Sequence, residues 1–286
     1  MAAKLLYQFD TDWTPSVFDS VVAFDGGADH VIGHARVTPD NVGGLVDGTI
    51  FTRGGKDKSC TAIFVGGGSM QAGEAVLEAV KRKFFGSFRV SVMLDSNGSN
   101  TTAAAGVALL AKAAPLSGKR AVVLAGTGPV GMRTAALLAQ EGAQVTITGR
   151  QRDKTEAAAQ AIAKRFGVQV EAREAADGEA RAAAIRGAQI VCAAGVIGQE
   201  LLAEQAWKGE DSIEMVADYN AQPPLGIAGI GVADKAKDHG GKLAFGALGI
   251  GGLKLKLHRA CVARLFESND QVLDAEAIYA LAKELA

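Results

Sequence analysis

A glycine-rich segment near the middle of the chain has the residue types and spacing of a phosphate-binding loop. The segment runs Gly126, Thr127, Gly128, Pro129, Val130, Gly131 and fits the pattern G-x-G-x-x-G. An apolar run, KRAVVLAG (119–126), precedes it and a helical Ala- and Leu-rich pattern follows it, which is the context that the motif requires. The first glycine permits a tight turn, the second lets the backbone approach a pyrophosphate, and the third lets helix and strand pack closely. We therefore expect this loop to bind a dinucleotide at a helix N-terminus.

Three cations follow the next predicted strand, QVTITG (144–149), where an NAD-binding fold usually carries Asp or Glu. They are Arg150, Arg152 and Lys154. A carboxylate at this position would repel a 2′-phosphate, whereas a guanidinium binds one through paired, charge-assisted hydrogen bonds. The alternative is a solvated surface loop, since charge runs are usually only surface. We favour the first interpretation, which makes NADP the expected cofactor.

A third predicted strand, AQIVCAAGVIG (188–198), ends in small residues. Ala194 and Gly195 leave open backbone beyond the carboxyl end of the sheet, where the nicotinamide ribose should pass. An ordinary strand-to-helix turn would have the same composition. We include both residues in the expected cofactor site.

Polar residues at other strand ends are candidates for substrate contacts. Asn97 and Thr102 follow RVSVML (89–94), and Asn220 follows SIEMVA (212–217). Ligands of open parallel sheets bind at these carboxyl ends, but DSNGSNTT (95–102) is equally typical of a helix N-terminal cap. Lys254 and Lys256 would lie on the same face of a strand but on different sides of a helix. A lysine in this apolar, Gly-rich setting is a candidate to stabilise charge near a reacting centre.

Composition limits the classes of partner and site. The formal net charge of −1 gives no overall field to attract nucleic acid or an anionic membrane. The three cysteines are far apart, and the four histidines offer no convincing helical pair, so we expect no metal site. The N-terminus lacks the apolar run of a signal peptide, and free thiols suit a reducing compartment, so we expect a cytoplasmic protein.

The elements that position these residues alternate along the chain as strand and helix. This pattern predicts an α/β protein of two domains: a Rossmann-type, doubly wound parallel sheet, and an N-terminal α/β substrate domain completed by C-terminal helices. The Pro and Gly break at PLSGK (115–119) sets one boundary. We expect residues 1–114 and 257–286 to form the substrate domain, and residues 115–256 to form the nucleotide domain.

Several long stretches resemble one known family. These stretches are FDTDWTPSVFD, AFDGGADH, VDGTIFTRGGK, MLDSNGSNTTAAAG, LAGTGPVGMR, DYNAQPPLGI and FGALGIGGLKLKLHRAC. The chain is similar, from about residue 4 to its end, to the NADP-dependent methylene-tetrahydromethanopterin dehydrogenases of methylotrophic bacteria. The resemblance implies an oxidoreductase of one-carbon metabolism that oxidises N5,N10-methylene-tetrahydromethanopterin, and methylene-tetrahydrofolate too, to the methenyl form by hydride transfer to NADP. It also implies a homo-oligomer, a trimer or a hexamer.

The resemblance also implies roles for particular residues. The loop Gly126–Gly131 would hold the pyrophosphate and Arg150 the 2′-phosphate. Lys256, in the matching GLKLKLHRA motif, would lie beside the pterin as the catalytic residue. Asn97, Thr102 and Asn220 belong to matching polar stretches and would contact the substrate.

Two other functions remain as alternatives. A relative of the shikimate or folate dehydrogenases would share the two-domain arrangement, although the one Tyr and Lys pair at helical spacing, Tyr279 and Lys283, lies in the last predicted helix and not in the early position that a cyclohydrolase requires. A non-catalytic NADP sensor would bind the cofactor without transferring hydride.

Overall fold

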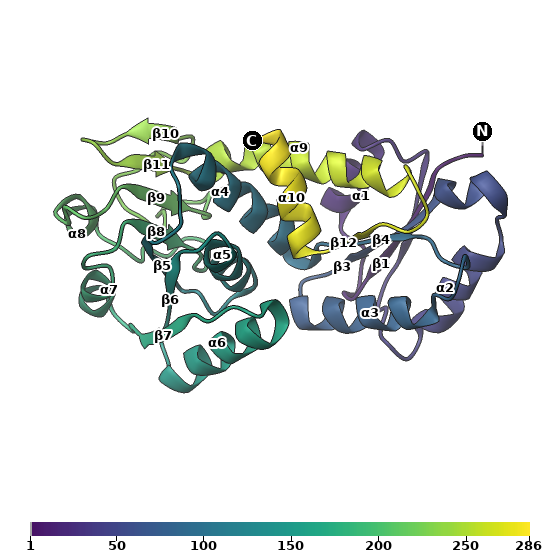
Figure 1. The fold of residues 1–286 in the computed structure, drawn as a ribbon, viewed down its shortest axis with the longest axis horizontal. Helices are drawn as coiled ribbons and strands as arrows, with labels where there is room; N and C mark the ends of the chain where they lie inside the picture. The colour runs from purple at the N-terminus through teal and green to yellow at the C-terminus, as the bar shows by residue number, and fades with distance from the viewer. Residues whose placement is uncertain (1) are drawn as a thin grey trace. The chain divides into compact units, whose positions relative to one another are not determined.

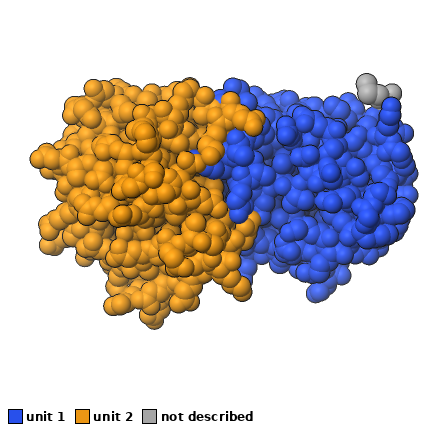
Figure 2. Space-filling model, viewed as in Figure 1, with its two compact units in different colours: residues 1–101, 255–281, 285 blue, residues 102–254, 282–284, 286 orange. Residues whose placement is uncertain are grey.

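The computed structural model of the chain describes residues 2–286, which form two compact units. Unit 1 contains the residues up to Thr101 together with Leu255–Leu281 and Leu285. Unit 2 contains Thr102–Lys254, Ala282–Glu284 and Ala286. Figure 2 colours unit 1 blue and unit 2 orange. The predicted domain boundaries at residues 114 and 256 stay a prediction.

Unit 1 is built on a five-stranded parallel sheet. Its strands are β1 (Leu5–Asp10), β2 (His30–His34), β3 (Thr61–Gly66), β4 (Ser91–Leu94) and β12 (Val272–Leu273), in the order β12-β4-β3-β1-β2. Every residue of β3 and β4 is buried, as expected for central strands of a parallel sheet covered on both faces. The two-residue strand β12 pairs with β4, so the C-terminal part of the chain completes the sheet of the N-terminal part.

Helices cover both faces of this sheet (Figure 1). They are α1 (Val17–Asp25), α2 (Val42–Phe51), α3 (Met70–Lys83), the later part of α9 (Ala247–Leu265) and α10 (Ala275–Leu285), with short 3₁₀ turns at Gly55–Cys60 and Ser96–Gly98. A core of buried apolar side chains from β1, β3 and β4 packs against α2 and α3. The sheet and helices confirm the expected α/β class for this part of the chain.

Unit 2 has a seven-stranded sheet in the order β10-β11-β9-β8-β5-β6-β7. Its strands are β5 (Arg120–Leu124), β6 (Gln144–Gly149), β7 (Glu171–Glu174), β8 (Ile190–Ala193), β9 (Met215–Asp218), β10 (Lys235–Asp238) and β11 (Leu243–Phe245). All pairings are parallel except that of the edge strand β10 with β11. The chain leaves β5 for β6 on one side and returns to β8 on the other, which confirms the predicted doubly wound arrangement with a switch point between β5 and β8.

The helices of unit 2 also lie on both faces of its sheet (Figure 1). They are most of α4 (Ser99–Ala113), α5 (Pro129–Gln140), α6 (Arg152–Phe166), α7 (Gly178–Ala184), α8 (Glu204–Lys208) and the start of α9. The helix α5 follows β5 directly in the chain, so its N-terminus lies at the carboxyl edge of the sheet, beside the switch point between β5 and β8.

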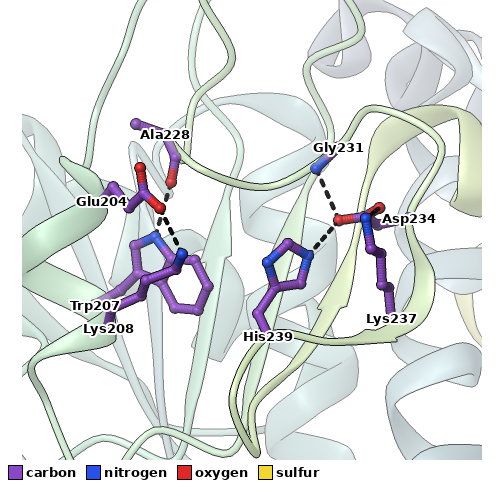
Figure 3. Close-up of polar contacts among 8 residues, drawn as sticks. All are labelled: Glu204, Trp207, Lys208, Ala228, Gly231, Asp234, Lys237 and His239. Atoms are coloured by element: carbon purple, nitrogen blue, oxygen red, sulfur yellow. Dashed lines mark hydrogen bonds and ion pairs between the residues drawn. The ribbon is translucent and has the colours of Figure 1, made fainter.

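A polar cluster around the buried Trp207 and Asp234 holds the loop before β10 (Figure 3). The indole Nε1 of the fully buried Trp207 donates to the carbonyl oxygen of Ala228 at 2.8 Å. Oδ2 of Asp234 accepts from the Gly231 N–H at 2.7 Å and lies 2.7 Å from Nε2 of His239. Burial opposes ionisation of Asp234, but these two hydrogen bonds, with Lys237 nearby, lower the pKa of its carboxyl group overall. The cluster therefore fixes this loop around a charged carboxylate.

Packing and capping decide the bounds of two helices in unit 1. The segment VGGLVDGTIF forms α2, which its three glycines disfavour, because Val42, Val46 and Ile50 repeat at helical spacing and are all buried. Pro15 lies just before α1, and Ser16 is the N-cap of that helix, where its side chain accepts from the Asp19 N–H. Within residues 2–286, none of the helices has the length and apolar composition needed to cross a lipid bilayer.

Candidate functional site

The glycine-rich loop lies between the end of β5 and the start of α5. Gly128 is the N-cap of α5, and Pro129 takes the first helical position, where its missing N–H costs nothing. Ala125 adopts a left-handed conformation with φ of 52°, and its N–H donates to Oγ1 of Thr148 at 3.2 Å. The Gly126 N–H donates to the carbonyl oxygen of Thr148 at 2.8 Å. The turn is thus fastened to β6 by two hydrogen bonds before the helix begins.

The three glycines of the motif are required for different reasons. A Cβ atom on Gly131 would lie 2.7 Å from Cα of Gly126, and a Cβ atom on Gly126 would lie 2.8 Å from Cβ of Ile147. Both positions therefore need glycine for packing. A Cβ atom on Gly128 would meet nothing within 4 Å, so this glycine keeps space open over the N-terminus of α5. That open space, with the helix amides behind it, suits a phosphate group.

Two pockets adjoin the loop and share Thr127 and Arg150 in their lining. One has a volume of about 170 Å³ and extends from Gly128 to the end of β8, where Ala194 and Gly195 line it. The other has a volume of about 340 Å³. Its lining residues are Thr127, Arg150, Gln151, Lys154 and Thr155. Because they share two lining residues, the two pockets adjoin one another beside the loop.

The three predicted cations have different surroundings. Arg150 and Lys154 are exposed and line the larger pocket, at the start of α6. Arg152 is exposed too, but its Nε donates to Oε1 of Glu156 at 2.8 Å, and this pair raises the pKa of the guanidinium group. Arg152 is not in the lining of either pocket. Two cations, at positions 150 and 154, therefore face the space where an anion would bind.

The sequence patterns missed two groups that shape the smaller pocket. Thr148 lines it and holds the turn at Ala125. Arg181 of α7 also lines it, while its Nε donates to the carbonyl oxygen of Leu201 at 2.7 Å. A Cβ atom on Gly195 would lie 2.7 Å from Cδ1 of the same leucine, so glycine is needed for that contact. Because these residues meet only in the folded chain, no local motif could have identified them.

Asn97 lies in a segment that also serves as a helix cap. The buried Asp95 accepts hydrogen bonds from the N–H and Oγ1 of Thr101, and the side-chain nitrogen of Asn100 donates to the carbonyl oxygen of Leu94. Asn97 itself is exposed and has a left-handed backbone conformation with φ of 56°. Its N–H donates to the carbonyl oxygen of Gly67. The capping interpretation thus holds for the neighbours of Asn97, while the side chain of Asn97 faces solvent.

The other two predicted substrate residues belong to unit 2. Thr102 is half-buried on α4. Asn220 is buried and uses both ends of its side-chain amide, accepting from the Gln222 N–H and donating to the carbonyl oxygen of Pro224, each at 3.0 Å. Burial raises the pKa of the neighbouring Asp218, although that carboxyl group accepts from backbone N–H groups. Asn220 therefore shapes the turn after β9.

Lys256 lies on α9, not on a strand. It is exposed, and its Nζ donates to the carbonyl oxygen of Leu285 at 3.2 Å. Lys254 is half-buried on the same helix, and residues two apart on a helix point to different sides. Of the two alternatives for the lysine pair, the diverging helical arrangement is the one that the structure has. Residues 2–286 contain no group of three or more His, Cys, Asp or Glu side chains suited to hold a metal ion.

Comparisons with known proteins found sequence matches to part of the chain and to all of it. Residues 17–97 match the family model described as "Methylene-tetrahydromethanopterin dehydrogenase, N-terminal". The "Bifunctional protein MdtA" of Methylorubrum extorquens is 69% identical over 288 residues, and an "NAD(P)-dependent methylenetetrahydromethanopterin dehydrogenase" of that organism is 32% identical over 296 residues; each match covers 100% of both chains.

Among solved structures, the ligand-free 5-ketofructose reductase of Gluconobacter sp. strain CHM43 has a similar fold. The TM-score is 0.57 at 18% sequence identity, with 100% of both chains covered. This likeness concerns the fold, whereas the full-length sequence matches concern the family. The chain belongs to the methylene-tetrahydromethanopterin dehydrogenase family.

Proposed function

We propose that the protein oxidises N5,N10-methylene-tetrahydromethanopterin, and the tetrahydrofolate analogue, to the methenyl form with NADP as the hydride acceptor. The observation that carries the choice of NADP is the pocket of about 340 Å³ that opens from the glycine loop and is lined by Arg150 and Lys154. The choice of a pterin substrate is supported by the sequence similarity of the whole chain to relatives in the dehydrogenase family.

The residues of unit 2 fit NADP at each of its charged groups. The open space at Gly128 and the amides at the start of α5 would take the pyrophosphate. Arg150 and Lys154 would take the 2′-phosphate, which NAD lacks. Ala194 and Gly195 would let the nicotinamide ribose pass over the end of β8. NADP, when bound, supplies a ring carbon that accepts hydride.

The protein contributes chiefly position and electrostatics to this reaction. The lone pairs of the pterin nitrogens stabilise the cation left when hydride departs, so a strong acid or base is not needed. The chain must hold two rings face to face and exclude competing water. We propose that the exposed ammonium group of Lys256 lies beside the pterin and disfavours protonation of the nitrogen next to the reacting carbon.

Two further features belong to this proposal. Asn97 and Thr102 offer polar side chains to the substrate, and Asn220 shapes the turn after β9 that adjoins the site. Cys60, Cys192 and Cys261 are free thiols, which supports a reducing, cytoplasmic location. We also propose a homo-oligomer, for which light scattering or native mass measurement is the test.

The test of the function is an absorbance assay for NADPH formation with purified protein and methylene-tetrahydromethanopterin, run in parallel with methylene-tetrahydrofolate and with NAD. We expect formation of the reduced cofactor with NADP and a much lower specificity constant with NAD. NADP binding measured by calorimetry without turnover of either pterin would refute the dehydrogenase proposal and favour a cofactor-binding protein.

A further inference from the structure

One buried histidine ring contacts several separate segments of unit 1. His258 of α9 is fully buried, and its ring stacks on Phe64 of β3, with centroids 5.6 Å apart and planes 19° apart. Phe18 of α1 lies on it at 6.4 Å in a tilted arrangement. Nδ1 of the histidine is 3.9 Å from Oδ2 of Asp95, in the loop after β4. The ring therefore joins α9 to β3, to α1 and to that loop.

Asp95 in turn holds the loop that carries Asn97. Its carboxylate is fully buried and accepts from the N–H of Thr101 at 3.0 Å and from its Oγ1 at 2.6 Å. Burying a carboxylate is costly unless hydrogen-bond donors surround it, so the two donors of Thr101 stabilise Asp95 in this position. The imidazole of His258 lies beside the same carboxylate. Cys261, one turn beyond the histidine, stays a neutral thiol, because burial and the Asp95 carboxylate both raise its pKa. The imidazole of His258 reaches this carboxylate from α9.

The position of Lys256 on α9 depends on the rotation of that helix about its axis. His258 follows Lys256 by two residues, so the buried ring and the exposed ammonium group lie on different sides of the helix. A side chain about 5 to 6 Å from the helix axis moves ~1 Å for each 10° of rotation. A misplacement of about 1 Å in a reacting geometry can lower the rate ~100-fold.

We infer that His258 is a positioning residue: it sets the rotation of α9 that presents Lys256, and through Asp95 it fixes the loop that carries Asn97. This role in turnover rests on the proposed dehydrogenase function. The histidine itself is buried and does not touch the substrate. Its contribution passes through the stacked ring and through the contact of Nδ1 with the carboxylate.

Two substitutions separate these contributions. His258→Phe keeps a ring on Phe64 and removes Nδ1, whereas His258→Asn loses the ring but places an amide nitrogen near the position of Nδ1. For His258→Phe we expect kcat to fall about 10- to 100-fold, and the KM for NADP to stay within about twofold because the nucleotide pockets lie in unit 2. Val80→Ala is the matched control: it removes buried volume from the core of unit 1 away from the ring, and should lower the melting temperature without changing kcat.

A double-substitution experiment distinguishes positioning from a general loss of stability. If the histidine acts through Lys256, His258→Phe should cost less than about twofold in kcat when introduced into Lys256→Met. The same loss in both backgrounds would overturn the inference. Asp95→Asn, which keeps the side-chain volume, tests the same contact and replaces His258→Phe if that variant does not fold.

Hydrogen exchange gives a readout that does not depend on the pterin reaction. The N–H of Thr101 donates to Asp95, so His258→Phe should speed exchange in residues 95–101 while His258→Asn restores part of the protection. Unchanged exchange in His258→Phe would overturn the inference even if the wild-type enzyme is active. Absence of pterin oxidation by the wild type, with faster exchange in the variant, would refute the proposed function and leave the anchoring role of the histidine standing.

Discussion

Replacing Arg150 by alanine should convert the enzyme toward equal use of NADP and NAD. Arg150 and Lys154 are the two cations in the lining of the larger pocket, so the substitution removes one of two positive charges there. A hydrogen bond to a charged group contributes about 1.5 to 3 kcal/mol, and about 1.4 kcal/mol corresponds to a tenfold change. We expect the KM for NADP to rise about 10- to 100-fold and the KM for NAD to stay within about twofold.

Arg152→Ala is the control for this experiment. The two arginines are two residues apart and both exposed, but Arg152 is paired with Glu156 and does not line the pocket. Its removal should change the KM for NADP less than about threefold, because an exposed helical ion pair contributes little. The effect of Arg150→Ala should also shrink at high salt, where the charge that it removes is screened.

The assay is initial-rate kinetics with each cofactor at saturating methylene-tetrahydromethanopterin. An equal rise in KM for NADP and NAD after Arg150→Ala would mean that this side chain contacts the part common to both cofactors. A larger NADP effect from Arg152→Ala than from Arg150→Ala would refute the assignment of the 2′-phosphate to this pocket.

Four further substitutions test other parts of the structure. Gly128→Ala should leave the melting temperature within about 2 °C and weaken NADP binding in calorimetry, whereas Gly131→Ala should lower the melting temperature by several degrees, because the added Cβ atom overpacks against Gly126 at a cost of about 1 to 3 kcal/mol. Lys256→Met should lower kcat far more than it changes the KM for NADP, and unchanged turnover would remove this lysine from the site. Asp234→Asn should destabilise the protein by about 2 kcal/mol at neutral pH. Folding lowers the pKa of the Asp234 carboxyl group, so the contribution of this group to the free energy of unfolding is full above the ordinary carboxyl pKa and is lost as the pH falls through the lowered value. Thermal melts of the variant and the wild type should therefore converge in acid.

Much of the fold could be predicted because parallel strands leave a strong local pattern. The segment that forms β3 is buried throughout, and those that form β5 and β6 carry buried aliphatic side chains; each ends in a glycine or is followed closely by one, which marks its carboxyl end. By contrast, α2 has three glycines and no polar face, so only its packing against α3 makes it a helix. The strand β12 is two residues long, and only its pairing with β4 defines it.

Some residues of the candidate site could be predicted from the sequence, and others could not. The glycine motif and the cation at position 150 follow from spacing along the chain, because one strand-turn-helix unit positions them. Arg181 could not be predicted, because it reaches the pocket from another helix. Nor did the chain by itself reveal that Glu156 pairs with Arg152, or that the amide of Asn220 is used within its own turn. His258 had no visible signal, since its partners are far away in sequence.

The pairing of β12 with β4 has a consequence for the order in which a ribosome releases this protein. The last strand of the unit 2 sheet ends at Phe245, but the unit 1 sheet acquires its edge strand only when Val272 and Leu273 emerge. The sheet whose strands are synthesised first is therefore the last sheet to be completed. At about 5 to 20 residues per second, the apolar β4 waits roughly 10 to 40 seconds for its neighbour. A nascent chain in this interval exposes an open strand edge, which makes it a natural client for a chaperone.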